Sequence, residues 1–308
     1  MKSKYIIAVS GGVDSVVLLH KLVSVAPEGV MYIVAHFDHG IRSDSADDAE
    51  FVRELAKKYD VGFVTERAEL GPDASEELAR NKRYEFLRSV MHKFKAEGII
   101  VAHHQDDVVE TMIVNMLRGT GARGLVGFSQ HGIVRPFIRK TKQDLLDYAK
   151  EHDLKWHEDS TNSDDKYMRN YVRQNLIPRL GKSDVDELLS IRSGLSELTL
   201  EINSLSKKML VGLCRLTRAY GMDGIDNEGN KVYELYRPKF VALSYVVRRE
   251  LIATLLRLEG VEISMDMVER AVNAVATLGV KKHIVLKKGA ELHSAKDLVL
   301  FKITPQSV

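Results

Sequence analysis

The sequence has little cysteine, no long apolar run and almost no net charge, and each shortage excludes something. Cys214 is the only cysteine among the 308 residues. An intramolecular disulfide is therefore excluded, and a metal site built from cysteines is nearly excluded. A single cysteine is also consistent with a protein that works in a reducing compartment. No apolar stretch approaches the roughly 20 residues that span a bilayer. The apolar run that begins at Tyr5 ends before Gly11, too soon for a signal peptide. We therefore expect a cytoplasmic protein with no membrane segment.

The net charge of the chain does not by itself indicate a nucleic-acid partner. Lysine and arginine total 45 and aspartate and glutamate 43, which leaves a formal net charge of +2. Any RNA-binding surface must therefore be a local basic patch on a nearly neutral molecule. With 44% hydrophobic and 29% charged residues, the chain has the composition of a globular protein with a core of normal size.

The first half of the chain alternates short apolar runs with amphipathic segments, which predicts a doubly wound, mainly parallel α/β sheet. Asp73 and Glu76 stand at the spacing of a capping box before the third helix. The expected strands are Tyr5–Val9, Met31–Phe37, Val61–Thr65 and Ile99–Ala102, and the expected helices are Val16–Val23, Asp47–Tyr59, Ala74–Phe94 and Asp106–Leu117.

The residue patterns in the second half of the chain predict a smaller, mostly helical module with a few strands. After a loop at 158–164 and a short basic helix, a long helix over Asp184–Leu216 is expected to link two domains. The remaining expectations are the helices Phe240–Leu258 and Met265–Thr277 and the strands His283–Leu286, Glu291–His293 and Leu298–Ile303. We expect a catalytic domain at 1–182, a linker at 183–217 and a small α+β module at 218–308, whose basic residues indicate either tRNA contact or a solvated face.

The loop Ser10-Gly11-Gly12-Val13-Asp14-Ser15 follows the first strand and opens the first helix. Adjacent glycines let backbone N–H groups turn toward an anion, and the positive end of the helix dipole points at the same place. Asp14 would repel phosphate unless a cation intervenes, which indicates a Mg²⁺ site. The bland alternative is a tight strand-to-helix turn. No Gly-Lys-Ser/Thr follows, so this is not a Walker A loop.

This hexapeptide resembles the signature of the PP-loop ATP pyrophosphatases. The resemblance implies that ATP is cleaved between its α and β phosphates, that an oxygen of the substrate is adenylated, and that the loop holds the departing pyrophosphate. ATP and Mg²⁺ are then the expected cofactors, with Ser10, Gly11, Gly12, Val13, Asp14, Ser15, His36 and Asp38 at the nucleotide and Asp14 and Asp38 at the metal.

Within that superfamily the chain resembles the tRNA(Ile)-lysidine synthases over most of residues 1–180. The resemblance implies that the wobble cytidine of a CAU anticodon is adenylated and then attacked by the side-chain amine of free L-lysine. Val108 stands where the family usually has glutamine. The matching motifs are Ala35–Arg42, Ala79–Phe86, Ala102–Thr111, Leu117–Gly121, Gly124-Leu125, Arg135–Phe137, Trp156–Asn162 and Tyr167–Arg173.

Two carboxylates and an imidazole at the end of the fourth strand suit an incoming amine. Asp107 and Glu110 lie three residues apart on one helix face, and His103 precedes them by one turn. Carboxylates hold an ammonium group and can accept the proton that the amine must lose, and Glu110 as the base is our hypothesis. The alternative is that Asp106 and Asp107 cap the helix and Glu110 is a solvated surface residue.

Several further residues are expected to contact phosphate, ribose, metal or tRNA. Arg118 ends the same helix, where it either contacts phosphate in catalysis or only complements the helix dipole. Asp38 reads a ribose, lies near the metal, or is a turn residue before Gly40. Guanidinium groups suit phosphate contacts, so by resemblance we assign to tRNA the residues Arg80, Arg83, Arg169, Asn170 and Arg173.

Three alternatives remain open at this point, as does the oligomeric state, a homodimer included. A tRNA thiolation enzyme of the same superfamily would commonly need more cysteines than Cys214. An amidating synthetase such as GMP synthetase would need ammonia from a glutaminase, for which no nucleophile is visible. A non-catalytic ATP-binding regulator would leave Asp107 and Glu110 without a purpose.

Overall fold

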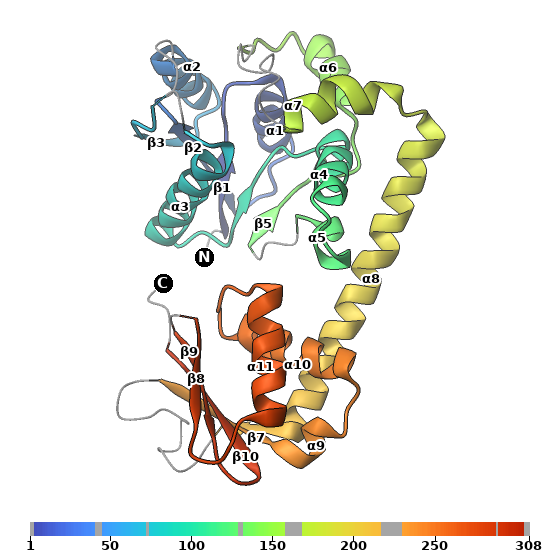
Figure 1. Cartoon of the computed structure of the whole chain (residues 1–308). Coiled ribbons are helices and arrows are strands. Elements are labelled where there is room, and N and C mark those ends of the chain that lie inside the picture. The colour runs from blue at the N-terminus through green and yellow to red at the C-terminus, as the bar shows by residue number, and fades with distance from the viewer. Residues whose placement is uncertain are drawn as a thin grey trace. The chain divides into compact units, whose positions relative to one another are not determined.

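The computed structural model describes residues 3–40, 45–71, 74–128, 132–157, 168–216, 230–287 and 289–304. The chain divides into two compact units, Met1–Leu195 and Ser196–Val308. The boundary falls inside the long helix α8 (Lys182–Leu213), within the segment expected to link two domains (Figure 1). None of the helices in these described ranges is both long enough and apolar enough to cross a membrane.

The first unit is built on a five-stranded parallel sheet in the order β3-β2-β1-β4-β5. The order places β1 in the centre and reverses direction beside it, so the carboxyl ends of β1, β2 and β4 meet at one edge. This confirms the predicted fold class. The strands are β1 (Ser3–Ala8), β2 (Val30–Asp38), β3 (Gly62–Arg67), β4 (Gly98–Ile100) and β5 (Ile133–Val134).

Successive strand residues face opposite sides of this sheet and pack into two separate cores. Ile6 of β1 belongs to the core under α3, and Ile7 belongs to the core under α1, α2 and α6. Ile99 and Ile100 of β4 divide in the same way. Both faces are therefore covered, which is why these strands are apolar throughout rather than alternating.

The helices of the first unit mostly begin and end near their predicted bounds. Ser75 is the N-cap of α3, and its Oγ accepts the N–H of Leu78 at 3.2 Å; Asp73, the expected capping residue, lies outside the described residues. The helix α6 was not predicted, although Thr141 and Asp144 form a capping box at its start. The helices are α1 (Val13–Ser24), α2 (Ser45–Lys58), α3 (Glu76–Phe94), α4 (Gln105–Leu117), α5 (Ala122–Val126) and α6 (Lys142–Glu151).

The predicted basic helix after residue 166 is only partly regular. It consists of α7 (Met168–Tyr171), a π-helical turn η2 (Val172–Leu176) and a 3₁₀ turn η3 (Ile177–Arg179). The loop expected at 158–164 lies outside the described residues. Both α7 and the π-helical turn contact α4 within the first unit.

The second unit combines helices with an antiparallel sheet in the order β6-β7-β10-β9-β8. Cys214–Leu216, expected to end the long helix, is instead strand β6, because it pairs with β7, which was not predicted. The expected helix Phe240–Leu258 is two helices, since Ser244 caps the second of them. The elements are β6 (Cys214–Leu216), β7 (Lys231–Tyr236), α9 (Arg237–Val241), α10 (Tyr245–Leu258), α11 (Met265–Thr277), β8 (His283–Lys287), β9 (Ala290–Ser294) and β10 (Leu298–Ile303).

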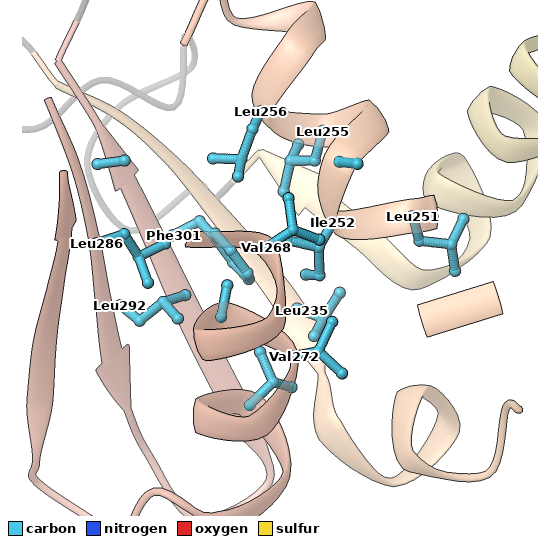
Figure 2. Packing of buried hydrophobic residues seen from close by; sticks show 14 of the residues in the cluster. Leu235, Leu251, Ile252, Leu255, Leu256, Val268, Val272, Leu286, Leu292 and Phe301 are labelled. Atoms are coloured by element: carbon cyan, nitrogen blue, oxygen red, sulfur yellow. The ribbon is translucent and has the colours of Figure 1, made fainter. Parts of the chain in front are cut away.

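One apolar core holds this second unit together. Leu251, Ile252 and Leu255 of α10 and Val268 and Val272 of α11 pack on the sheet. They form one cluster with Leu235, Leu286, Leu292 and Phe301 from the strands, and Figure 2 shows Ile252 and Val268 close to Phe301. Burial of each such side chain contributes about 1.5–3 kcal/mol, so the unit has a core of its own.

Candidate active site

A cavity of about 410 Å³ opens where the strands of the first unit end. Its lining comes from the ends of β1, β2 and β4, from α3 and from the start of α4. Doubly wound sheets bind their ligands at this place. The predicted site residues that line it are Ser10, Gly12, Asp14, Ser15, His36, Asp38, Arg83, His103 and Asp107.

The first wall of the cavity is Ser10–Ser15, which we call the β1 loop. Ser15 Oγ accepts the N–H groups of Ser10 at 3.2 Å and Gly11 at 3.3 Å, and donates to the carbonyl of Gly12 at 2.9 Å. Gly11 has a φ of 101°, which other residues rarely adopt, whereas Gly12 at −73° is ordinary in conformation. Val13 is buried in the core, so only its backbone can face a ligand. The loop is thus held open largely by its own hydrogen bonds.

The end of β2 contributes two buried polar side chains. His36 is 3% exposed, and its Nδ1 lies 2.9 Å from the carbonyl of Val9, to which it donates. Burial lowers the pKa of His36, so the ring is neutral and Nε2 is an acceptor. Asp38 accepts the N–H of Gly40 at 2.8 Å, as its turn interpretation required, and it also faces the cavity. Gly40 cannot carry a side chain, because a Cβ would lie 2.2 Å from the carbonyl oxygen of Ala68.

The start of α4 forms the opposite wall. Asp107 Oδ2 accepts the N–H of His104 at 2.9 Å, so it does cap the helix, and it lines the cavity as well. The ring of His104 lies between Asp107 and Asp14, with Nε2 at 3.6 Å and 3.7 Å from their oxygens. The capping and functional interpretations of Asp107 are therefore compatible.

Glu110 is buried, with 4% of its surface exposed. The alternative interpretation of Glu110 as a solvated surface residue is therefore wrong. Its Oε2 accepts from Arg173 Nε at 2.8 Å, and Arg169 Nε lies 3.6 Å from its Oε1. Arg173 also approaches Asp107, at 3.9 Å. The family motifs around α4 and α7, distant in sequence, thus meet through a buried carboxylate that holds two arginines beside Asp107.

His103 lies in a basic environment. Arg135 Nε donates to His103 Nδ1 at 3.3 Å, and Phe128 packs on the imidazole with ring centroids 4.9 Å apart. Burial, followed by the charges of Arg83, Arg135, Arg80 and Arg169, lowers the pKa of His103 to about 3. The imidazole is therefore neutral at physiological pH. We call His103, Asp107 and Glu110, with Arg135, Arg169 and Arg173, the α4 cluster.

The structure does not bring every predicted residue to the cavity. Arg118 is the exposed C-cap of α4, about 16 Å along the helix from Asp107 at 1.5 Å per residue. Its position matches the dipole interpretation rather than the catalytic one. Arg80 and Arg83 both lie over the ring of Tyr84, and only Arg83 of the two lines the cavity. Asn170 is half-buried on α7.

Sequence reasoning assigned no site role to Arg135, described above, or to Lys142 and His157. Lys142 Nζ lies 2.6 Å from Asp14 Oδ1, so α6 delivers a cation to the β1 loop. His157 donates its backbone N–H to the carbonyl of Gly11 at 3.1 Å and places its Nδ1 2.7 Å from Asp48. A capping box from Thr141 to Asp144 was the available signal for α6, whereas nothing local marks His157 as a neighbour of Gly11.

The oxygen ligands at the cavity suit Mg²⁺ only in part. Asp14 and Asp38 both line it, and Mg²⁺ usually takes one or two carboxylates together with phosphate oxygens and waters. Asp14 forms an ion pair with Lys142. Asp38 accepts the N–H of Gly40, and its Oδ2 lies 3.6 Å from Nε of Arg67. Among the described residues no three His, Cys, Asp or Glu side chains are grouped to hold a metal. Asp14, the more exposed carboxylate, fits such an ion better than Asp38.

Comparison with known proteins matches the family model described as PP-loop domain to residues 1–180. The chain belongs to the PP-loop family. Its curated relatives include the tRNA(Ile)-lysidine synthase of Exiguobacterium sibiricum, 36% identical over 205 residues, and that of Solibacter usitatus, 37% identical over 178 residues. These matches cover 65% and 56% of this chain but only 47% and 40% of the relatives, so the matched part is less than half of each.

A solved structure gives independent support for the PP-loop fold. The U34-tRNA thiolase NcsA from Methanococcus maripaludis superposes with a TM-score of 0.56 over 64% of this chain and 71% of its own. Its sequence identity is 18%, so the likeness concerns the fold alone. The predicted membership of this PP-loop family is confirmed.

Proposed function

We propose that this PP-loop protein is a tRNA(Ile)-lysidine synthase. One observation carries the proposal: a single cavity is lined both by the β1 loop and by the carboxylate of Asp107. An anion-binding loop and an amine-binding carboxylate on one cavity suit a reaction in which ATP activates a substrate and an amine then attacks it. Sequence likeness to proteins of that name supports the choice of lysine and tRNA.

The reaction has two balanced steps. The carbonyl oxygen of the wobble cytidine in a CAU anticodon attacks the α phosphorus of ATP, and the bond to pyrophosphate breaks. The side-chain ammonium of free L-lysine then loses one proton and forms a C–N bond at the activated carbon, AMP departs with the carbonyl oxygen, and the attacking nitrogen loses a second proton. The products are lysidine, AMP and pyrophosphate.

The β1 loop is suited to hold pyrophosphate at the N-terminus of α1, where orphan N–H groups and the helix dipole favour an anion. His36 Nε2 offers an acceptor to the nucleotide. Asp14, with Asp38 as the second carboxylate on the cavity, would hold Mg²⁺, which neutralises phosphate charge when bound. Arg80, Arg83, Arg169, Asn170 and Arg173 are the proposed contacts with tRNA phosphates.

Asp107 is the better of the two carboxylates for the lysine amine. Glu110 faces Arg173 and Arg169, whereas Asp107 lines the cavity. Glu110 would have to release an arginine before it could accept a proton, so we assign the ammonium contact and the proton to Asp107. Glu110 then serves by holding the two arginines, and the catalytic contribution earlier expected of Arg118 is not part of the proposal.

The thiolation alternative gains nothing from the structure. Cys214 is the single cysteine and is 9% exposed in the core of the second unit. Burial raises the pKa of Cys214 to about 12, which keeps it a thiol rather than the thiolate that sulfur transfer requires.

The test is incorporation of radiolabelled lysine into an unmodified CAU-anticodon tRNA(Ile) transcript with Mg-ATP. We expect ATP-dependent label in this RNA with equal release of AMP, and none in an elongator methionine tRNA. Pyrophosphate release without lysine transfer, in a folded protein that binds this tRNA, would refute lysine as the nucleophile. Absence of any ATP cleavage with that RNA would refute the proposed substrate.

A further inference from the structure

The hydrogen bond between Arg135 and His103 determines where the proton of His103 lies. An arginine Nε–H is always a donor and never an acceptor. Because Arg135 Nε donates to His103 Nδ1 at 3.3 Å, that nitrogen carries a lone pair. A neutral imidazole with a lone pair on Nδ1 has its proton on Nε2. The ring therefore offers the cavity, which it lines, a donor and no acceptor.

The surroundings of Arg135 hold this arrangement in place. Its Nη1 donates to the carbonyl of Phe128 at 2.9 Å, and its guanidinium lies 5.0 Å from the centroid of the Phe128 ring. The same Phe128 ring packs on His103, with ring centroids 4.9 Å apart. Phe128 thus fixes the guanidinium and the imidazole together, so neither can turn without losing a contact.

Four arginines around His103 oppose a positive imidazole. Arg80 and Arg83 face it from α3, Arg169 from α7, and Arg135 from beyond β5. Asp107 lines the same cavity from α4 but is held by the N–H of His104. A further cation beside these four arginines would be strongly disfavoured.

We propose that Arg135 is a positioning residue which keeps His103 neutral with its proton on Nε2, so that His103 donates a hydrogen bond to a substrate oxygen. This deepens the proposed function and rests on it for the identity of that oxygen. A donor meets an acceptor, so the partner is a phosphate or carbonyl oxygen of the activated nucleotide and not the ammonium of lysine. The contact with the amine that the sequence analysis expected of His103, Asp107 and Glu110 is then assigned to Asp107 alone.

The first test reads the proton directly and needs no activity. Two-bond ¹H–¹⁵N spectra of histidine rings, with the His103 signal assigned by its loss in His103→Gln, distinguish the two tautomers and the cation. We expect the wild-type ring to show a protonated Nε2 and an unprotonated Nδ1 from pH 5 to pH 8, without titration. A proton on Nδ1, or a titration within that range, would overturn the proposal even if lysidine synthesis were confirmed.

Variants of Arg135 test the cause. In Arg135→Gln we expect the pKa of His103 to rise and the tautomers to mix, because a charge and a fixed donor are removed together. Arg135→Lys keeps the charge without the Nε–H, and should release the tautomer while the pKa changes less. Arg88→Gln, an exposed arginine of α3, is the matched control and should change neither. An unchanged tautomer in both folded Arg135 variants would contradict the positioning role.

Kinetics separate the oxygen contact from a lysine contact. His103→Gln retains an amide donor near the position of Nε2, whereas His103→Leu retains none. We expect kcat to be about tenfold higher in His103→Gln than in His103→Leu, a typical effect of one hydrogen bond, with the KM for lysine equal in both. A KM for lysine that rises in His103→Leu while kcat stays the same would place His103 on the amine instead.

Discussion

The β1 loop lines the same cavity as His103 and Asp107 of the α4 cluster, but the loop and the cluster hold their polar groups in place by different means. In the loop, Ser15 satisfies the N–H groups of residues at most five positions away. In the cluster, Glu110 is held by Arg173, which is 63 residues away, and His103 by Arg135, which is 32 residues away. Local hydrogen bonds fix the wall that we propose for the anion, whereas the wall that we propose for the amine depends on contacts between segments distant in the sequence. Mutations should therefore affect ATP and lysine separately.

The largest expected effect is that of Asp107→Asn. Asparagine retains an oxygen to accept the His104 N–H but loses the charge that binds an ammonium and accepts its proton. We expect lysine incorporation to fall by roughly 10² to 10⁴-fold, the usual range for loss of an acid–base group, while tRNA-dependent pyrophosphate release persists. Asp106→Asn is the control, because among the contacts described for this site its carboxylate meets neither Glu110 nor the arginines: it accepts the N–H of Lys142 at 3.4 Å and lies 4.0 Å from Nδ1 of His104. Equal loss of both half-reactions would contradict an amine-specific role.

Ser15→Ala is the corresponding test of the β1 loop. It leaves the N–H groups of Ser10 and Gly11 without the oxygen they now share, at a cost of about 1–3 kcal/mol. We expect the KM for ATP to rise about tenfold to a hundredfold, with the KM for lysine unchanged. Ser24→Ala, at the other end of α1, removes a hydroxyl bonded to the carbonyl of His20 and should leave both constants alone. A parallel rise in both constants would show that the two walls are not independent.

Lys142→Ala should have a smaller effect, because Lys142 belongs to neither wall and acts through its ion pair with Asp14 of the β1 loop. The side chains are 40% and 30% exposed, so the pair contributes under about 1 kcal/mol to stability. Its loss leaves Asp14 uncompensated beside incoming phosphate, and we expect about tenfold weaker ATP binding by calorimetry. Lys150→Ala, in the last turn of the same helix, is the control. Tighter ATP binding in Lys142→Ala would instead mean that Lys142 competes with a cation for Asp14.

The contrast between the two walls also explains what the sequence could predict. The alternation of apolar runs and the hexapeptide Ser10–Ser15 are local patterns, so the parallel sheet and the position of the β1 loop between β1 and α1 were predicted correctly. Lys142 and Arg135 reach the site only through tertiary packing, and no spacing connects them to Asp14 or His103. The solvated interpretation of Glu110 was wrong for the same reason, since the residues that bury it lie 59 and 63 positions further along the chain.

The second unit shows the same limit in its secondary structure. Cys214–Leu216 continues the apolar pattern of the preceding helix, so a helical interpretation was natural. Pairing with β7 decides the matter, because Cys214 lies opposite Leu235 in the antiparallel sheet. Tertiary pairing overrides local propensity at such helix-to-strand junctions. Met265–Thr277, with its apolar residues at helical spacing and a serine cap, was by contrast predicted to the residue.

The smallest expected effect is that of Arg118→Ala, and it sharpens the comparison because Arg118 lies on α4 but outside the α4 cluster. An exposed residue at the C-cap contributes through the helix dipole by about 0.3–1 kcal/mol, so thermal unfolding should shift only slightly. Lysine incorporation under saturating substrates should stay within about twofold of wild type, as for surface substitutions away from a site. A hundredfold loss of lysine incorporation with unchanged stability would return Arg118 to catalysis. It would also require the tRNA to bridge the length of α4, so that the helix acts at both ends. A rise in the KM for tRNA alone would place Arg118 among the phosphate contacts and leave the division between the two walls intact.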